Sequence, residues 1–543
     1  MSARNRDLIF DSKYFRTTSM TSSRRPLILA SLLIAAFAIN LDTTIVNVAL
    51  PALVRQLSAS DSQLQWVVDA YNLVFAAFIL AAGSLSDRVG RKGMLLAGLV
   101  VFGLASFAGG LAGSSGELIA ARAVMGLGAA MVFPSTLSLI ANVFTDRGER
   151  ALAIGLWGAT AGMAIALGPI VGGFLLQHFS WSSIFFAMTP VAILGGALVA
   201  VYAPTSRDER AAPLDRAGFL LSTGAMALLI YTIIEAPEHG WGSVRTLAGF
   251  ALTAVLMIGF LARERGAEAP MLDLSMFGNL RFSAASLSVT VSFFTLLGFI
   301  FLMTQYFQFI RGYSALSAGV HLLPVALSVG ASSVIGTRLA VKLGTKLVVG
   351  AGLVMIMAFY LWVSTGMYPT FPYGTIAVQM VLYGTGMGLT SAPATEAIMG
   401  AVSLRKAGAG SAVNDATRLL GGTLGVAVIG SVFASSYTSR LSGAGLTGVP
   451  AHLLSQANES IGRALGVAQG LAAHGQLAPA SALHNAAVSA FDHGVSVGCL
   501  VAAAVAGVGA IAALVWLPAQ PMAPAAESEE PPARGAALQG ALR

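Results

Sequence analysis

Fourteen separate stretches of this sequence are each about as long and as apolar as a segment that crosses a lipid bilayer. A spanning helix needs roughly 20 mostly apolar residues. Only 10% of the residues are charged, whereas soluble domains carry about 25%. Since backbone polar groups inside lipid must be hydrogen-bonded within the segment, we expect an all-α integral membrane protein. The expected spans are 26–50, 64–84, 93–113, 117–142, 151–176, 183–202, 217–236, 244–263, 282–309, 315–338, 346–366, 374–398, 407–433 and 493–516.

The basic residues predict how these spans are oriented. Cytoplasmic loops of membrane proteins carry an excess of Lys and Arg. With the N-terminus inside and the spans alternating, 24 of the 31 Lys and Arg residues fall in inside segments and 5 in outside segments. We therefore expect a multi-pass protein of the plasma (inner) membrane with both termini cytoplasmic. The formal charge of +7 reflects this bias and not nucleic-acid binding, because no basic stripe is present.

Loop composition divides the chain into domains. We expect a cytoplasmic N-terminal segment over 1–25 and a six-helix bundle over 26–202. Residues 203–281 would hold an inserted helix pair with flanking loops, and 282–516 a second six-helix bundle. The tail 517–543, rich in Pro, Ala and Glu, is expected to be disordered in the cytoplasm.

Two further features concern the second bundle. Residues 434–492 form a long outside loop with two apolar stretches at helical spacing, either a short surface hairpin or a loosely ordered loop. Residues 337–346 echo residues 83–92 in their Leu, basic, Gly and Lys positions, at an offset close to that between the first spans of the two bundles. The bundles therefore look like parallel repeats, whose interface near the bilayer midplane is where transporters bind substrate.

Three charged residues stand out inside the spans of the first bundle. Asp42 lies in the run Leu41–Pro51 of the first span, and Arg122 opens the run Arg122–Ala130 of the fourth. A charge inside a span is costly and normally faces a cavity or a partner. At 1.5 Å of rise per residue, Asp42, Arg122 and Asp69 lie roughly 8–12 Å below the outer ends of their spans. An arginine between two carboxylates is therefore a plausible buried network.

Two glycine-containing motifs follow in the same bundle. Between spans two and three, glycines permit a tight turn, and Asp87 could sit against a helix N-terminus while Arg88 and Arg91 hold it. In span five, small residues at four-residue spacing let helices pack closely, and a proline bends the helix. The turn motif comprises Gly83, Asp87, Arg88, Gly90 and Arg91, and the span-five motif Gly158, Gly162, Gly168, Pro169, Gly172 and Gly173.

With these four motifs the chain resembles the major facilitator superfamily, and more narrowly its fourteen-span drug:proton antiporter family, which includes quaternary-ammonium multidrug exporters. The resemblance runs from span one to about Gly425. It implies a major facilitator fold of two six-helix bundles plus two inserted helices, 14 transmembrane helices in all. It also implies proton coupling at Asp42 and Arg122 and a cytoplasmic latch at the turn motif. The Gly-Pro motif of span five resembles that of exporters, so the resemblance implies export. Met125 replaces a frequent Gln, and Trp181-Ser182-Ser183 an expected Trp-Arg-Trp, which suggests a divergent branch.

The second bundle carries its own candidate charges, Glu396, Asp415 and Arg418. Asp415 and Arg418 are three residues apart and could pair on one helix face. Asp69 and Asp415 replace residues that are uncharged in the family pattern, which favours cationic cargo unless the two arginines neutralise them. The aromatic residues over 293–309 either line an apolar pocket or pack in the core.

We therefore expect a proton-coupled antiporter that exports hydrophobic, and on the carboxylate argument cationic, drugs or toxic amphiphiles by alternating access. Its partners would be a small-molecule substrate, protons and membrane lipid, with the need for an accessory protein left open. An alternative is a dedicated exporter of one endogenous metabolite, such as an antibiotic, siderophore or lipid. A sensor or scaffold that has lost transport is a third reading, which the retained motifs disfavour.

Several function classes are disfavoured. The lone Cys499 excludes an intramolecular disulfide, and no histidine pairs with a Cys or Asp at metal-ligand spacing. The chain has no phosphate-binding G-x-x-x-x-G-K-[ST] loop and no Ser/His/Asp constellation within its spans. We expect no cofactor, no metal and no enzymatic activity.

Overall fold

The structure is a computed structural model that describes residues 24–57, 61–207, 215–267, 270, 272, 274–366 and 371–520. All regular secondary structure in these residues is helical, so the all-α expectation is confirmed. The expected N-terminal segment lies outside the described residues except for Arg24 and Arg25, and the expected disordered tail beyond Gln520 lies outside them too.

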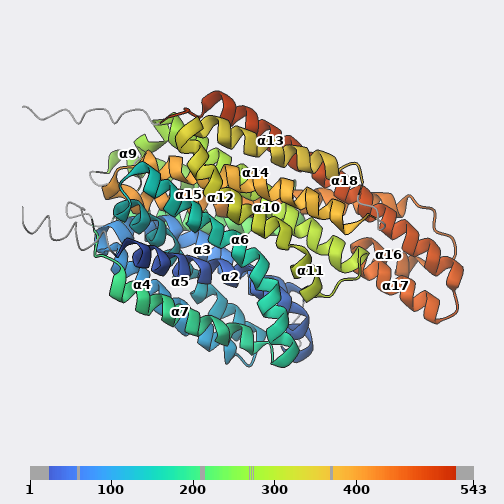
Figure 1. Cartoon of the computed structure of the whole chain (residues 1–543). Helices are drawn as coiled ribbons and strands as arrows, with labels where there is room; N and C mark the ends of the chain where they lie inside the picture. Colours follow the sequence, from blue (N-terminus) through green and yellow to red (C-terminus); the bar gives the residue numbers. More distant parts are fainter. Residues whose placement is uncertain are drawn as a thin grey trace, which may run out of the picture.

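Long helices run back and forth along one axis (Figure 1). The start of the first helix and the end of the last lie at the same end of the molecule, here the terminal end, and the opposite end is the loop end (Figure 1). The principal helices are α2 (Arg25–Leu57), α3 (Asp61–Val89), α4 (Arg91–Gly110), α5 (Ser115–Val143), α6 (Arg147–His178), α7 (Ser182–Tyr202), α8 (Arg216–His239), α9 (Val244–Gly266), α10 (Leu280–Gln305), α11 (Ala315–His321), α12 (Leu323–Leu343), α13 (Thr345–Val363), α14 (Tyr373–Gly400), α15 (Ala407–Ser442) and α18 (Leu477–Trp516).

Within the described residues, 13 helices are long and apolar enough to cross a membrane, with α11 and α12 counted as one span. The remaining expected span, 374–398, is the twelfth in the chain and forms the 28-residue helix α14, which is long enough but less apolar. Its glycines, serines and threonines lower its hydropathy, and it packs between α12, α13 and α10. A helix enclosed by protein does not need a lipid-compatible surface, which accounts for the difference.

Two hydrophobic cores organise the molecule. One is built mainly from α2 to α7 (the first half), and the other mainly from α10 to α18 (the second half). The turns before α4 and α13 match, because Gly90 and Gly344 both precede the helix with positive φ, +122° and +94°. These glycines are 254 residues apart, the same offset as the sequence echo. The domain boundaries themselves stay a prediction.

Helices α8 and α9 lie between the halves in sequence and pack mainly against each other, while α8 also contacts α3 and α15. At the terminal end, Arg263 donates a hydrogen bond of 2.8 Å from Nε to Asp215, which caps α8. That hydrogen bond lowers the pKa of the half-buried Asp215 carboxyl. Helices α8 and α9 are therefore held together by this hydrogen bond, and α8 lies beside the contact between α3 and α15.

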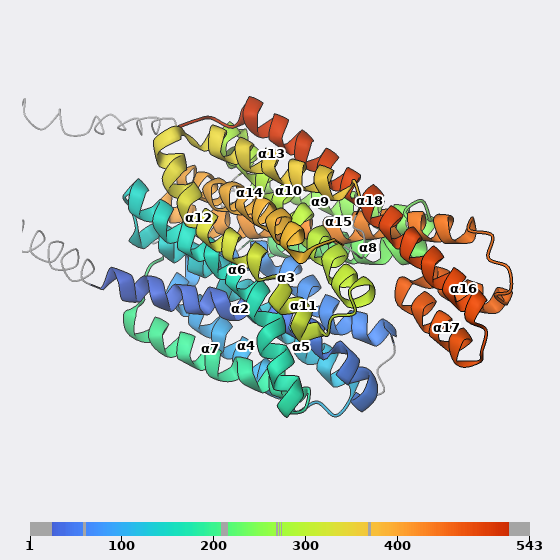
Figure 2. The same ribbon diagram turned by 45° about the vertical axis from the view of Figure 1, so that its right-hand side comes forward.

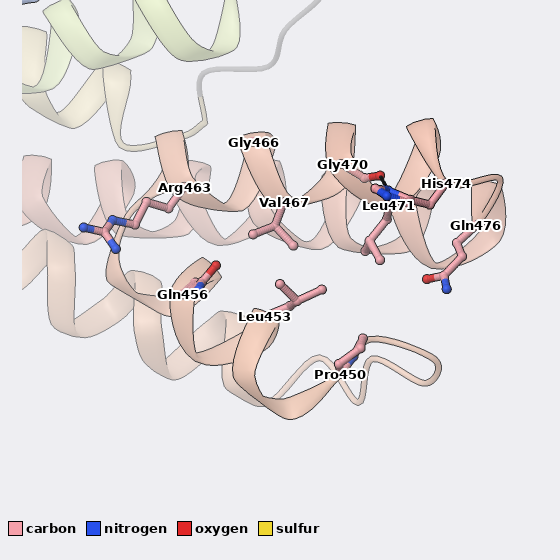
Figure 3. A pocket seen from close by; sticks show the side chains of 10 residues that line it. All are labelled: Pro450, Leu453, Gln456, Arg463, Gly466, Val467, Gly470, Leu471, His474 and Gln476. Atoms are coloured by element: carbon pink, nitrogen blue, oxygen red, sulfur yellow. Dashed lines mark hydrogen bonds between the residues drawn. The ribbon is translucent and has the colours of Figure 1, made fainter. Parts of the chain in front are cut away.

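The segment 434–492, expected as a loop, is helical over most of its length. Helix α15 continues to Ser442, α18 starts at Leu477, and α16 (Ala451–Glu459) and α17 (Ile461–Ala473) lie between them. Figure 2 shows this unit projecting at the loop end. Its side chains, including the fully buried Leu483, belong to the second core. A loosely ordered loop is therefore the wrong reading, because the apolar stretches continue the core beyond the span. Between α16 and α17 the unit holds an open pocket of about 690 Å³ (Figure 3).

Candidate functional site

Asp42 of α2 and Arg122 of α5 form a buried ion pair in the first half. Arg122 Nη1 lies 2.5 Å from Asp42 Oδ2, and each side chain is 1% exposed. Arg122 also donates from Nε to the carbonyl of Val67 at 2.9 Å, and its guanidinium lies 4.3 Å from the centre of the Tyr71 ring. Asp42 Oδ1 has no hydrogen-bond partner in the described part of the chain. A buried carboxylate with one unbonded oxygen can accept a proton there.

Close helix packing places this pair. Gly126, one turn after Arg122, lies so near the carbonyl of Tyr71 that a β-carbon would clash with it. Helix α5 can therefore approach α3 closely enough for Arg122 to reach the Val67 carbonyl. Asp69 is half-buried on α3, two residues beyond Val67. The ion pair that the structure describes for Arg122 is the one with Asp42, so a share for Asp69 stays a prediction.

The turn motif contacts the second half at the terminal end. Asp87 accepts hydrogen bonds from the backbone N–H groups of Gly408 and Ala409, at 2.9 and 3.1 Å, in the first turn of α15. Arg91 Nη2 lies 2.6 Å from the same carboxylate. A helix N-terminus carries partial positive charge, so it favours this anion. Gly83 permits the approach, because a β-carbon there would meet the Gly408 carbonyl and Ala412. Arg88, the residue after Asp87, is half-buried.

Glu396 of α14 gathers three arginines at the terminal end. Its carboxylate lies 3.3 Å from Arg281 of α10, 3.5 Å from Arg150 and 3.8 Å from Arg147, both of α6. Glu396 is 2% exposed, and Arg147 and Arg150 belong to the other half. The cluster therefore joins the halves at a second point. This cluster does not include Asp415 and Arg418, the other two candidate charges that the sequence indicates in the second bundle.

Arg418 of α15 does not form an ion pair with Asp415. Its guanidinium carbon lies 4.5 Å from the centre of the Trp157 ring and 4.8 Å from that of Phe293. Its Nη2 donates to Thr395 at 3.1 Å. The two charges interact electrostatically, but the guanidinium turns toward aromatic rings and makes no direct ion pair with Asp415 in this conformation. Asp415 instead accepts a hydrogen bond of 2.9 Å from Asn414.

A row of aromatic rings connects the two arginines. Tyr71, over which Arg122 lies, contacts Phe75 at 5.9 Å between ring centres, and Phe75 contacts Phe133 at 5.9 Å. Phe133 contacts Trp157 at 5.1 Å, and Trp157 faces Arg418. The Trp157 Nε1 donates to Thr136 Oγ1 at 3.1 Å, which fixes the indole. An apolar wall with a cation at each end thus crosses the first half.

The span-five glycines pack α6 against both halves. Gly168 and Gly172 contact α2 through Thr44 and Ile45, while Gly173 contacts Leu316 of α11. Gly158 and Gly162 face α14 and α12 of the second half. Pro169 lies inside α6 and contacts Gly319. The motif therefore lets α6 serve as a packing surface between the halves.

Sequence reasoning missed the partners of Glu396 and the aromatic row. Arg147, Arg150 and Arg281 looked like ordinary positive-inside residues. Their helices place them at the same end as Glu396, so counting depth along all spans would have brought these four charges to one level. The row draws its rings from α3, α5 and α6, and no spacing within one helix reveals it.

Comparison with known proteins was made on sequence and on fold. Residues 32–426 match the Major Facilitator Superfamily. The multidrug resistance protein Stp of Mycobacterium tuberculosis (strain CDC 1551 / Oshkosh) is 36% identical over 405 residues, 75% of each chain. The multidrug efflux pump LfrA of Mycolicibacterium smegmatis is 33% identical over 491 residues, 90% of this chain and 95% of LfrA.

Solved structures give the same fold. The human organic anion transporter MFSD10 (TETRAN) superimposes with a TM-score of 0.59 over 90% of this chain and 98% of its own. At 12% sequence identity this likeness concerns the fold alone.

Proposed function

The chain belongs to the Major Facilitator Superfamily, and from that premise we propose that it is a proton-coupled antiporter that exports hydrophobic cations by alternating access. The names of the relatives Stp and LfrA support drugs as the cargo. In this proposal the terminal end faces the cytoplasm of a cell whose inner membrane holds the protein. The single observation that carries the proton coupling is the buried Asp42–Arg122 pair with one unbonded carboxylate oxygen.

The chemistry follows from burial. Separating two charges in a low-dielectric site leaves each uncompensated, at a cost of about 3–5 kcal/mol. Protonation of Asp42 removes its share of that penalty and its attraction for the guanidinium, so Arg122 then gains by moving to another partner or to water. Deprotonation restores the pair. A conformational change that exposes Asp42 to one side and then the other therefore carries a proton with it.

The contacts at the terminal end supply the conformational part. Asp87 at the α15 N-terminus and Glu396 with Arg147 and Arg150 both join the halves there. In this proposal these contacts hold the state closed at this end, and opening it requires both sets of charges to separate. Exchange of one proton for one monovalent cation moves no net charge across the membrane, so the pH gradient drives it, with about 1.4 kcal/mol for each pH unit.

The test is proton movement in proteoliposomes that contain the purified full-length chain. An acid-loaded interior is challenged with a panel of lipophilic cations and neutral drugs, and a pH dye reports proton efflux. We expect cation-dependent efflux in the wild type and a loss of about 100-fold or more in Asp42→Asn, since no carboxylate remains to carry the proton.

The matched control is Asp146→Asn. Asp146 is exposed and caps α6 through a 3.0 Å bond from the Glu149 N–H, a role that asparagine fills equally well. Its efflux should equal that of the wild type. Efflux that survives Asp42→Asn contradicts the proposed coupling, and a response to one compound alone points to the dedicated exporter instead.

A further inference from the structure

The guanidinium of Arg418 lies in a slot between two aromatic rings, Trp157 on α6 and Phe293 on α10, at 4.5 and 4.8 Å from the ring centres. Trp157 belongs to the first half, and Phe293 and Arg418 belong to the second. Each residue lies about 15–20 Å along its helix from the terminal end, near the middle of a hydrocarbon core of about 30 Å. The slot is therefore a midplane contact between the halves.

Arg418 differs from Arg122 in what compensates its charge. Arg122 has the Asp42 carboxylate at 2.5 Å, whereas Arg418 has no ion pair in the described part of the chain. Arg418 is 6% exposed, its Nε has no hydrogen-bond partner among the described residues, and its Nη2 donates to the neutral Thr395. The Asp415 carboxylate interacts electrostatically with this guanidinium but forms no direct ion pair with it. A buried cation without a direct counter-ion is costly. The faces of the two rings supply further stabilisation, so the slot is suited to hold a cation.

We propose that the slot between Trp157 and Phe293 is the binding site for the cationic group of the cargo, and that Arg418 fills it as an internal ligand when cargo is absent. This inference rests on the proposed export of hydrophobic cations and names the chemistry that recognises them. Aromatic faces favour flat or quaternary cations with weak hydration, of which guanidinium is one. The matching cargo class is planar aromatic or quaternary ammonium ions. The row from Trp157 to Tyr71 continues the apolar wall toward the Asp42–Arg122 pair.

Asp415 gives the displaced arginine a place to go. It precedes Arg418 by three residues on α15, so both lie on the same face of the helix. One oxygen of its carboxylate accepts from Asn414, and the other, Oδ2, has no hydrogen-bond partner among the described residues. When cargo enters the slot, a rotamer change brings Arg418 to this oxygen. Cargo thus replaces one cation in the slot by another, and no buried charge is left unpaired.

The test measures equilibrium binding to the full-length protein in lipid nanodiscs with no proton gradient. Ethidium serves as the planar cationic probe and Nile red as a neutral probe of similar size, both followed by fluorescence. Trp157→Leu should weaken ethidium binding by roughly ten- to thirtyfold while Nile red changes by less than about twofold. Trp157→Phe should restore most of the affinity, because it keeps an aromatic face.

Two further variants separate binding from packing. Arg418→Gln removes the internal competitor, so ethidium should bind severalfold more tightly. Trp181→Leu is the matched control, because Trp181 is 4% exposed but packs on Phe185, away from the slot. It should leave the ratio of the two affinities unchanged.

Equal losses for ethidium and Nile red in Trp157→Leu, unchanged ethidium affinity in Arg418→Gln, or no ethidium binding by the wild type would each overturn the inference. Its failure is distinct from failure of the proposed function. If the wild type shows proton efflux but ethidium affinity does not change in the slot variants, only this inference is contradicted. Slot-dependent binding without proton movement contradicts only the antiport.

Discussion

An aspartate in the apolar core of a membrane protein is tolerated only with a partner, and that rule made Asp42 readable from the sequence. Its depth could be compared with that of Arg122 by counting residues, and the two are in contact. Arg418 shows where such reasoning stops. Asp415 was its expected partner by helical spacing, but the rings that hold it come from α6 and α10. Sequence spacing reports neighbours on one helix and says nothing about which rings face it from others.

A backbone prediction belongs to this scale. Gly90 adopts φ +122°, a conformation that side-chain-bearing residues rarely take, although a β-carbon there would meet only the Ser206 carbonyl, at an ordinary contact distance of 3.9 Å. Gly90→Ala should therefore destabilise the protein by about 1–3 kcal/mol through backbone strain alone. The measurement is the thermal unfolding midpoint in detergent. Gly93→Ala is the control, since Gly93 is helical with nothing within 4 Å, and its midpoint should stay level or rise. Equal thermal unfolding midpoints for Gly90→Ala and Gly93→Ala would show that alanine at position 90 causes no backbone strain.

At the scale of elements, the spans were predictable because apolar length is a strong signal, and the observed helices start within a few residues of the expected positions except for α18, which starts 16 residues before the expected span. Two elements departed from expectation for physical reasons. Helix α14 is less apolar because protein encloses it, and α15 and α18 are longer than a bilayer requires. With 36 and 40 residues, they extend about 54 and 60 Å, so the core continues beyond the lipid. Hydropathy marks the lipid boundary and not the end of a helix.

The seam at the start of α15 yields an element-scale prediction. Asp87→Asn removes the anion from the helix N-terminus and from Arg91, and Glu396→Gln removes the carboxylate from its three arginines. Each change should destabilise the state closed at the terminal end by about 1–2 kcal/mol. The double variant should therefore shift the population between closed and open by roughly 30-fold or more.

Spin labels at Val89→Cys and Leu343→Cys would report that shift by electron–electron distance measurement. Both sites are well exposed at the terminal ends of α3 and α12, and Cys499 is 1% exposed and so protected from labelling. The distance distribution should lengthen in the double variant and stay as in the wild type in Asp146→Asn. An unchanged distribution in the double variant would show that these charges do not hold the halves together.

At the scale of the whole molecule, the family followed from four short motifs, two of which occupy positions where the halves meet. The turn motif reaches α15 across the seam, and the span-five glycines lie against α2, α11, α12 and α14. The Glu396 cluster and the aromatic slot occupy the same interface and were not predicted, because each assembles residues from both halves. Contacts between halves are what alternating access must break and remake, so these sites belong to the mechanism that we propose.

The most direct test of the central claim is the number of protons released when cargo binds. Purified wild-type protein in weakly buffered nanodiscs is titrated with ethidium while a pH dye records released protons. The account predicts that about one proton leaves per cation bound, because binding is linked to deprotonation of Asp42. Ethidium affinity should then rise with pH, and Asp42→Asn should bind ethidium with no release and no pH dependence. Tight binding by the wild type without proton release would contradict the account.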